Sequence, residues 1–263
     1  MKKNIYLAQI IILLSCSYQE KSPVDYLAKT SEMTFNPFIA VLHVPTEDFV
    51  NLEDYIVELL ENQAKVIVIA KFLSDQKFYR GNLDSLIWSR DNIIIPILDN
   101  EDSLSEEPIF TKGITGFYRF TLEDLGTEYD LVTGFPITKL DSRSDPVGHL
   151  AIATACSFDK GLCKEILEIP GNYIEIKYFG NIAMYPVISQ NQISEDCIVK
   201  DKIVVLADLK DSDNLYTPAR YVYNDTIDGP DMHRAIILVN AIHTLLNKSS
   251  YYANHDRFSG FGD

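Results

Sequence analysis

Four short runs of β-branched and aliphatic residues dominate the hydrophobic pattern of the chain. They occupy residues 38–44, 65–70, 92–98 and 203–206. Each is apolar over most of its length rather than alternating, which is typical of a strand buried on both faces. Between the first three runs, apolar residues recur at steps of three and four: Leu52, Tyr55, Ile56, Leu59 and Leu60, then Leu83, Leu86 and Ile87. This spacing predicts amphipathic helices between the strands.

The alternation of strands and helices with short connections predicts βαβ units, which give parallel strands with right-handed crossovers. We therefore expect an α/β fold, with a mostly parallel sheet, helices on both of its faces and a small antiparallel strand pair. Residues 113–120 and 130–137 are the expected pair. An Ala-rich helix is predicted at 150–158 with a further helical turn at 162–167, and strict alternation at 172–178 predicts a half-exposed strand.

The last apolar run leads into a long polar loop and then a second periodic segment. Its apolar positions again follow helical spacing: Met232, Ala235, Ile236, Val239, Ile242, Leu245 and Leu246. Pro230 before this segment and Lys248 after it match the usual helix start and stop signals. The carboxy-terminal part is therefore predicted to be a buried strand, a long ordered loop and a helix with one apolar face.

The amino terminus has the pattern of an export signal. Lys2 and Lys3 precede an apolar run at residues 5–14, which is too short for a membrane span of about 20 residues. The sequence Leu-Leu-Ser-Cys that ends at Cys16 is similar to the bacterial lipobox. We expect residues 1–16 to be a lipoprotein signal with Cys16 as the lipidated residue, residues 17–34 to be a tether, and the protein to be held in the cell envelope by its lipid. An ordinary secretory peptide is the alternative.

Composition and charge narrow the classes of partner and cofactor. The formal net charge is −15 and no run of Lys and Arg occurs, so we expect no binding to nucleic acid. None of the four cysteines forms a C-x-x-C pair, which makes a structural zinc site improbable. A turn at residues 159–161 would allow a disulfide between Cys156 and Cys163, but we expect two separate thiols buried on helical segments, since free cysteine is commonly buried.

Motifs of known chemistry are absent from the sequence. It has no phosphate loop, nucleophile elbow, zinc-protease helix or calcium loop. His233 and His243 lie ten residues apart on one predicted helix, too far apart to bind one metal. The acidic residues Asp208, Asp211 and Asp213 are expected to form a solvated loop, and His43 a structural or surface residue. We therefore predict no enzyme activity, no metal and no cofactor.

Three segments near the carboxyl end resemble a known family. They are Asp-Asn-Leu-Tyr-Thr-Pro at 213–218, Gly-Pro-Asp-Met-His at 229–233 and Asn-Ala-Ile-His-Thr-Leu-Leu at 240–246. Their order after a buried strand is similar to the end of a CHASE domain of the second type, an extracytoplasmic sensory domain of bacterial signalling proteins. The resemblance covers residues 38–247, so a sensory domain is expected at 35–248 with a polar tail at 249–263. The chain departs from the family at His43-Val44-Pro45 and Ala70-Lys71, where relatives often carry aspartates.

The resemblance and the strand pattern together predict a function. No apolar run of membrane length follows residue 247, so a sensed signal is expected to pass to a separate envelope signalling protein. We expect an exported, lipid-anchored, non-catalytic sensory or ligand-binding domain. The alternatives are a structural interaction lipoprotein of the envelope and a hydrolase with an unrecognised carboxylate site.

A small-molecule ligand is expected beyond the carboxyl ends of the parallel strands, where open sheets form a crevice. Lys71 and Arg220 are expected to anchor an anion there, with Tyr216 as a wall. The full set of expected ligand-binding residues is Lys71, Asp213, Tyr216, Thr217, Arg220 and His233.

Overall fold

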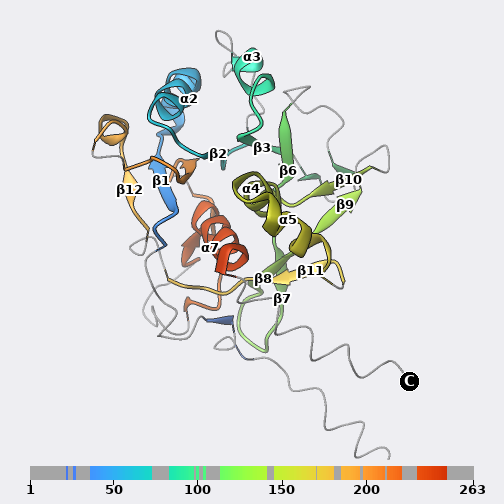
Figure 1. The fold of residues 1–263 in the computed structure, drawn as a ribbon. Coiled ribbons are helices and arrows are strands. Elements are labelled where there is room, and N and C mark those ends of the chain that lie inside the picture. Colours follow the sequence, from blue (N-terminus) through green and yellow to red (C-terminus); the bar gives the residue numbers. More distant parts are fainter. Residues whose placement is uncertain are drawn as a thin grey trace, which may run out of the picture.

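A computed structural model of the chain describes residues 22, 26–27, 36–72, 83–97, 99–100, 103–104, 113–140, 145–169, 171–180, 185–195, 198–210, 212–220 and 230–247. Its centre is a six-stranded sheet in the order β12-β1-β13-β2-β3-β6, in which every pairing is parallel (Figure 1). The strands are β1 (Ile39–His43), β2 (Val66–Ile69), β3 (Ile93–Ile97), β6 (Ile114–Phe117), β12 (Val187–Ile188) and β13 (Ile203–Ala207). The predicted α/β fold is confirmed.

Helices cover both faces of this sheet, which explains the continuous apolar runs. The 3-10 turn η2 (Thr46–Asn51), α2 (Leu52–Glu61) and α3 (Leu83–Trp88) pack on one face, and α4 (Leu150–Phe158) and α7 (Arg234–Asn247) on the other. Successive residues of a strand point to opposite faces. In β13, for example, Val204 and Leu206 join the core under α2, while Ile203 and Val205 join the core under α7.

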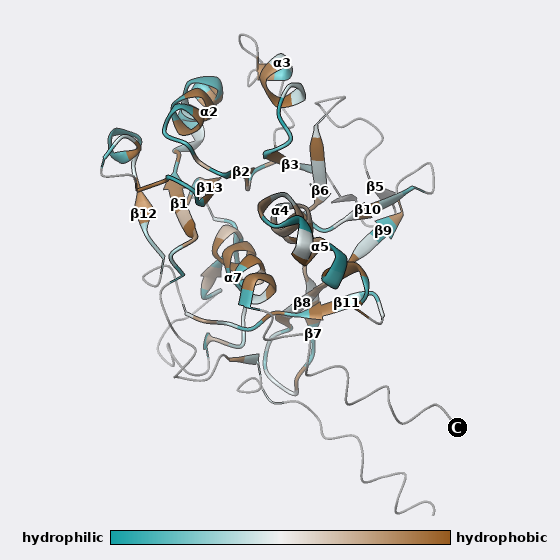
Figure 2. Cartoon of the chain, viewed as in Figure 1, coloured by the Kyte–Doolittle hydropathy of each residue, from teal (hydrophilic) through white to brown (hydrophobic). Residues whose placement is uncertain are grey.

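Helix α7 is buried on all sides rather than on one. Every residue from 235 to 245 is buried, including Asn240, His243 and Thr244. Figure 2 shows α7 mostly in the hydrophobic colour, whereas α2 presents both colours. The prediction of a single apolar face is therefore wrong. The polar residues of α7 hydrogen-bond to Lys177, Phe179 and Tyr185.

A second, antiparallel sheet has the order β11-β8-β7, with β7 (Thr121–Glu123), β8 (Leu131–Pro136) and β11 (Tyr173–Glu175). The predicted pairing of 113–120 with 130–137 is wrong, because β6 joins the parallel sheet and β8 pairs with β7 and β11. Gly116 in β6 lies against the start of α4, and a Cβ there would come within 2.6 Å of Leu150 Cα. The strand expected within 172–178 is present as β11, but its expected half-exposure is wrong, since residues 174–176 are all buried.

Three short antiparallel pairs complete the described elements. They are β4 (Asp99–Asn100) with β5 (Ser103–Leu104), β9 (Thr138–Leu140) with β10 (Pro146–Gly148), and β14 (Asn214–Leu215) with β15 (Met232–His233).

In the predicted tether, Tyr26 is buried at 2% exposure and its hydroxyl donates to Glu123 Oε2 at 3.0 Å, so this part of the segment contributes to the core. The predicted signal with Cys16 and the tail at 249–263 lie outside the described residues. No helix in the described part of the chain has the length and apolarity needed to cross a membrane.

A disulfide between Cys156 and Cys163 joins α4 to α5 (Lys160–Leu167), with the two Cα atoms 4.5 Å apart. The expectation of two separate thiols is therefore wrong. In one continuous helix, residues seven apart would be separated by about 10 Å along the axis. The chain instead turns at Asp159, which is extended and caps α5 by accepting from Gly161 N at 2.8 Å. This turn brings the two sulfur atoms together.

Removal of the disulfide by the pair Cys156→Ser and Cys163→Ser is expected to lower the free energy of unfolding by about 2 to 3 kcal/mol, since the bridge closes a short loop in the unfolded chain. Urea unfolding with and without dithiothreitol measures the loss. Reductant should lower the midpoint of the wild-type protein and leave that of the double variant unchanged. If reductant leaves the urea midpoint of the wild-type protein unchanged, the disulfide does not stabilise the fold.

Candidate functional site

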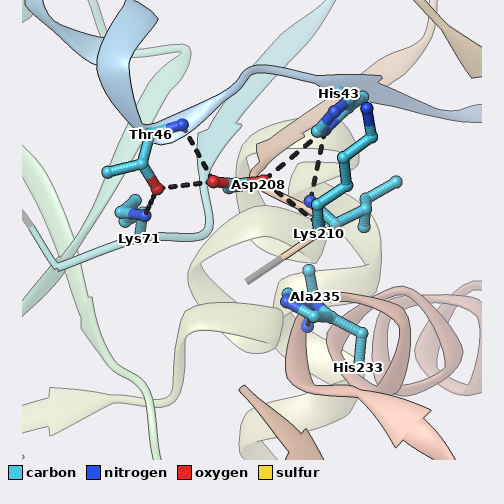
Figure 3. A network of polar contacts seen from close by, with 8 residues as sticks. His43, Thr46, Lys71, Asp208, Lys210, His233 and Ala235 are labelled. Atoms are coloured by element: carbon cyan, nitrogen blue, oxygen red, sulfur yellow. Dashed lines mark hydrogen bonds and ion pairs between the residues drawn. The ribbon is translucent and has the colours of Figure 1, made fainter. Parts of the chain in front are cut away.

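The carboxyl ends of β1 and β13 lie side by side, and the chain leaves them toward opposite faces of the sheet. The connection after β1 leads to α2 on one face, and the connection after β13 leads to α7 on the other. Such a reversal between adjacent parallel strands is where open α/β sheets form their ligand crevice. Four side chains gather here, and we call them the strand-end cluster: His43, Thr46, Lys71 and Asp208 (Figure 3).

Asp208 is the centre of the cluster. Its Oδ2 accepts from Thr46 N at 2.8 Å and from Thr46 Oγ1 at 2.5 Å, and its Oδ1 accepts from Lys210 N at 3.1 Å. Thr46 opens η2, where a backbone N–H has no partner within the turn and favours a carboxylate. The expectation that Asp208 belongs to a solvated acidic loop is wrong, because its exposure is 8%.

These hydrogen bonds keep Asp208 ionised. Burial alone would raise the pKa of its carboxyl group, but the hydrogen bonds from Thr46 and Lys210 and the charge of Lys71 outweigh burial and bring the pKa below its usual value. The cluster therefore holds a carboxylate at neutral pH whose negative charge is already balanced by protein donors.

Lys71 extends the network to the end of β2. Its Nζ donates to Thr46 Oγ1 at 2.5 Å, so the hydroxyl accepts from Lys71 and gives its own proton to Asp208. The ammonium also lies 5.3 Å from the ring centroid of Phe49. Lysine, threonine and aspartate thus connect the chain segments that follow β2, β1 and β13. Thr46 is exposed and Lys71 half-buried, so the network reaches solvent.

His43, the last residue of β1, stands beside Asp208. Its Nδ1 accepts from Leu209 N at 3.2 Å and lies 3.9 Å from Asp208 Oδ1. Because Nδ1 accepts, the neutral ring carries its proton on Nε2. Among the described residues, this buried Nε2 has no hydrogen-bond partner. The sequence favoured a structural or surface role for His43, and the structure places it beside Asp208 at the carboxyl edge of the sheet.

Asp213 and His233, both expected to bind ligand, instead hold the start of α7. Asp213 Oδ1 accepts from Arg234 Nε at 2.9 Å, and its carbonyl oxygen accepts from Arg234 N at 2.8 Å. His233 Nδ1 accepts from Ala235 N at 3.1 Å, as a capping residue does. Figure 3 shows His233 at the beginning of this helix. Both residues tie the loop after β13 to the helix that follows it.

Thr217, another expected ligand-binding residue, is fully buried and bonded to Asp231. Its N donates to Asp231 Oδ1 at 2.7 Å and its hydroxyl to Oδ2 at 2.6 Å. Burial raises the pKa of Asp231, and the hydrogen bonds from Thr217 reduce that rise without cancelling it. This pair closes the two ends of the long loop, so Thr217 has a role in the fold.

Tyr216 and Arg220 contact a different part of the molecule. Tyr216 stacks on Tyr129 with ring centroids 4.1 Å apart and 4° between the planes. The guanidinium of Arg220 lies 5.3 Å from the centroid of each ring. Of the six expected ligand-binding residues, Lys71 alone is hydrogen-bonded to the strand-end cluster within the described part of the chain.

The sequence did not single out the Thr46–Asp208 pair. Both residues directly follow predicted strands, which was the available signal, but 162 positions separate them along the chain. In the described ranges, no group of three or more His, Cys, Asp or Glu side chains is arranged to hold a metal ion.

Comparison with known proteins found no matching family model, no matching curated protein and no matching solved structure.

Proposed function

We propose that this chain is a non-enzymatic sensory domain that binds a small anionic ligand at the carboxyl edge of its parallel sheet. The strand-end cluster carries the proposal, because it lies where the connections of two adjacent strands diverge. The resemblance of residues 38–247 to type-two CHASE domains supports a sensory role.

The donors of the cluster favour an anion. Lys71 contributes an ammonium group, which is half-buried at the carboxyl edge of the sheet. The only carboxylate of the cluster, Asp208, is already satisfied by Thr46 and Lys210. A cation beside an acceptor that is already used suits a ligand rich in acceptors, such as a carboxylate or a phosphate.

The same contacts favour binding over catalysis. A general base works best when its pKa is near the operating pH, and the pKa of Asp208 is lowered below that of an ordinary aspartate. Thr46 gives its proton to this weak base while it accepts from Lys71, so its oxygen is poorly prepared to act as a nucleophile.

Ligand binding would act on the fold through Lys71. An anion that attracts the ammonium competes with Thr46, whose hydroxyl links η2 to the segment after β13. Since η2 leads directly into α2, the position of α2 on its face of the sheet would report the occupied site. A partner in the envelope would read this change.

Lys71→Ala is expected to abolish the ligand response. The purified protein would be heated with acetate, succinate and citrate, and the effective ligand should stabilise it by about 2.7 kcal/mol at 100 times its dissociation constant. Lys164→Ala, an exposed lysine on α5, serves as the matched control and should respond like the wild type. A response that survives in Lys71→Ala, or no response to any of these anions, would overturn the proposed site.

The anchor and the partner have separate tests. If Cys16 is lipidated, Cys16→Ser should leave the membrane fraction. Cross-linking in the native host followed by mass spectrometry should recover a membrane kinase or cyclase. Recovery of only porins and other lipoproteins would favour the structural interaction alternative.

A further inference from the structure

A concavity lies at the edge of the parallel sheet opposite the strand-end cluster. It has a volume of about 700 Å³ and is bordered by the residues just before β2 and β3, the first residue of β6, and the junction of α4 and α5. The size is that of a small-molecule site. We call it the amino-edge groove. Nothing in the strand-end cluster contributes to its walls.

The groove is basic in an acidic protein. Lys65, Arg90 and Lys160 line it, against the single carboxylate of Asp91. The whole chain carries a formal net charge of −15, so a concavity with three cations has the opposite sign of charge to the chain as a whole. The three come from distant parts of the chain and are exposed to solvent. Within the described residues, no ion pair involves the side chain of Arg90 or Lys160.

The disulfide and an aromatic contact position these cations. Cys156 lines the groove, and its bond to Cys163 closes the short loop that carries Lys160. Lys65 Nζ lies 4.0 Å from the ring centroid of Phe158, a cation–π contact in the same loop. The junction between α4 and α5 is thus closed by the disulfide and held against the beginning of β2 by the contact of Lys65 with Phe158. Such preorganisation lowers the entropy lost on binding.

We propose that the amino-edge groove binds a phosphate group. A phosphate monoester carries a charge of about −1.5 to −2 at neutral pH, which three cations and one carboxylate balance closely. The planar guanidinium of Arg90 suits bidentate contact with phosphate oxygens. The hydroxyl of Ser157 adds a polar group to the wall, while Ile114 and Ala153 provide apolar surface for the organic part of the ligand. The phosphate belongs either to a soluble ester or to a lipid headgroup.

Charge reversal in the groove tests the proposal. The groove variant combines Arg90→Glu with Lys160→Glu. The control variant combines Lys164→Glu with Lys200→Glu, which makes the same charge change at two exposed lysines outside the groove lining. Titration calorimetry of the purified protein with glycerol 3-phosphate probes the soluble ester. Co-sedimentation with phosphatidic acid vesicles, compared with phosphatidylcholine vesicles, probes a lipid headgroup that is a phosphate monoester.

The groove variant should bind the phosphate probe at least about tenfold more weakly than the wild type, because it loses charge-assisted hydrogen bonds. The control variant should stay close to wild type. Heat with glycerol 3-phosphate assigns the groove to a soluble ester, and selective sedimentation with phosphatidic acid assigns it to a lipid headgroup. Equal weakening in both double variants, or no binding to either probe, would overturn the proposal.

Lys71→Ala separates the two sites. The variant should keep phosphate binding in the amino-edge groove while it loses the ligand response of the strand-end cluster. Phosphate binding that is lost in Lys71→Ala and kept in the groove variant would assign the phosphate to the strand-end cluster and refute the groove.

Discussion

Acidification from pH 6 to pH 5 is expected to lower the free energy of unfolding by about 2.4 kcal/mol, because two buried histidines are neutral in the folded protein. Burial lowers the pKa of His149 from 6.5 to about 3, against a smaller opposing effect of a hydrogen bond with the Arg119 backbone. Burial also lowers the pKa of His243 from 6.5 to about 4. A domain whose total stability is about 5 to 15 kcal/mol would lose much of it.

The surroundings of each ring explain why it remains neutral. His149 caps α4, with Nδ1 accepting from Ala151 N at 3.1 Å, and stacks on Phe135 at a centroid distance of 4.4 Å. His243 stacks on Phe179 at 3.8 Å, and its Nδ1 lies 3.1 Å from the Tyr185 hydroxyl. A protonated ring in either place would be a charge surrounded by aromatic groups, which is costly.

The sign follows from proton linkage. Both folded pKa values lie below the unfolded value of 6.5, so the stabilisation is complete above pH 6.5. As the pH falls below 6.5, the unfolded chain binds two protons that the folded chain does not bind. Each proton lowers the free energy of unfolding by up to about 1.4 kcal/mol per pH unit. The loss from His243 levels off near pH 4, and that from His149 near pH 3.

Urea unfolding at a series of pH values from 7.5 to 5 measures this slope. His149→Asn retains a good capping residue, and His243→Gln retains a hydrogen-bonding group; each should reduce the slope by up to about 1.4 kcal/mol per pH unit. The comparison is between slopes, so a constant loss of stability in a variant does not affect it. Slopes in both variants equal to that of the wild type would contradict the assignment.

Asn240→Ala is expected to cost about 3 to 5 kcal/mol, because it leaves several buried groups without hydrogen bonds. Asn240 lies within α7 at 0% exposure. Its Oδ1 accepts from Phe179 N at 2.9 Å and from the Tyr185 hydroxyl at 3.2 Å. Its Nδ2 donates to Gly180 O at 3.2 Å and, within the helix, to Ile236 O at 3.0 Å. One side chain therefore joins the helix to Phe179, Gly180 and Tyr185.

Urea unfolding of Asn240→Ala, compared with Asn214→Ala, tests this role. Asn214 is exposed on β14, and its replacement should change the stability by no more than about 0.5 kcal/mol. Asn240→Leu keeps the volume of the side chain but removes its hydrogen bonds, so it should be nearly as destabilised as Asn240→Ala. An Asn240→Leu protein with wild-type stability would show that packing, rather than hydrogen bonding, holds the helix.

Polar residues inside α7 also show how far a pattern can be interpreted. The apolar spacing from Met232 to Leu246 correctly predicted a helix, but one with a single buried face. Asn240, His243 and Thr244 do not belong to that apolar set, yet they are buried, and they hydrogen-bond to Tyr185, Phe179 and Lys177. Periodicity describes which residues prefer burial. It contains no information on a distant segment that can satisfy buried polar groups.

The candidate site was likewise predicted only in part by the sequence. The rule that crevices form beyond parallel strands directed attention to Lys71, which the structure places in the strand-end cluster. The same rule also suggested Asp213 and Thr217, which the structure uses to hold the loop before α7. All three are polar residues that follow predicted strands, and the local backbone decided which of them joins the strand-end cluster.

The sequence by itself determined the α/β class, the four central strands and most helices, because these depend on burial patterns over a few neighbouring residues. Tertiary structure alone decided the partners of β6 and β8, the closure of the Cys156–Cys163 disulfide, the pairing of Thr46 with Asp208, and the meeting of Lys65, Arg90 and Lys160. Each of these depends on where the chain turns: Asp159 separates two helices, and the chain leaves β1 and β13 toward opposite faces of the sheet. Contacts between distant residues are set by such turns, which short-range periodicity does not encode.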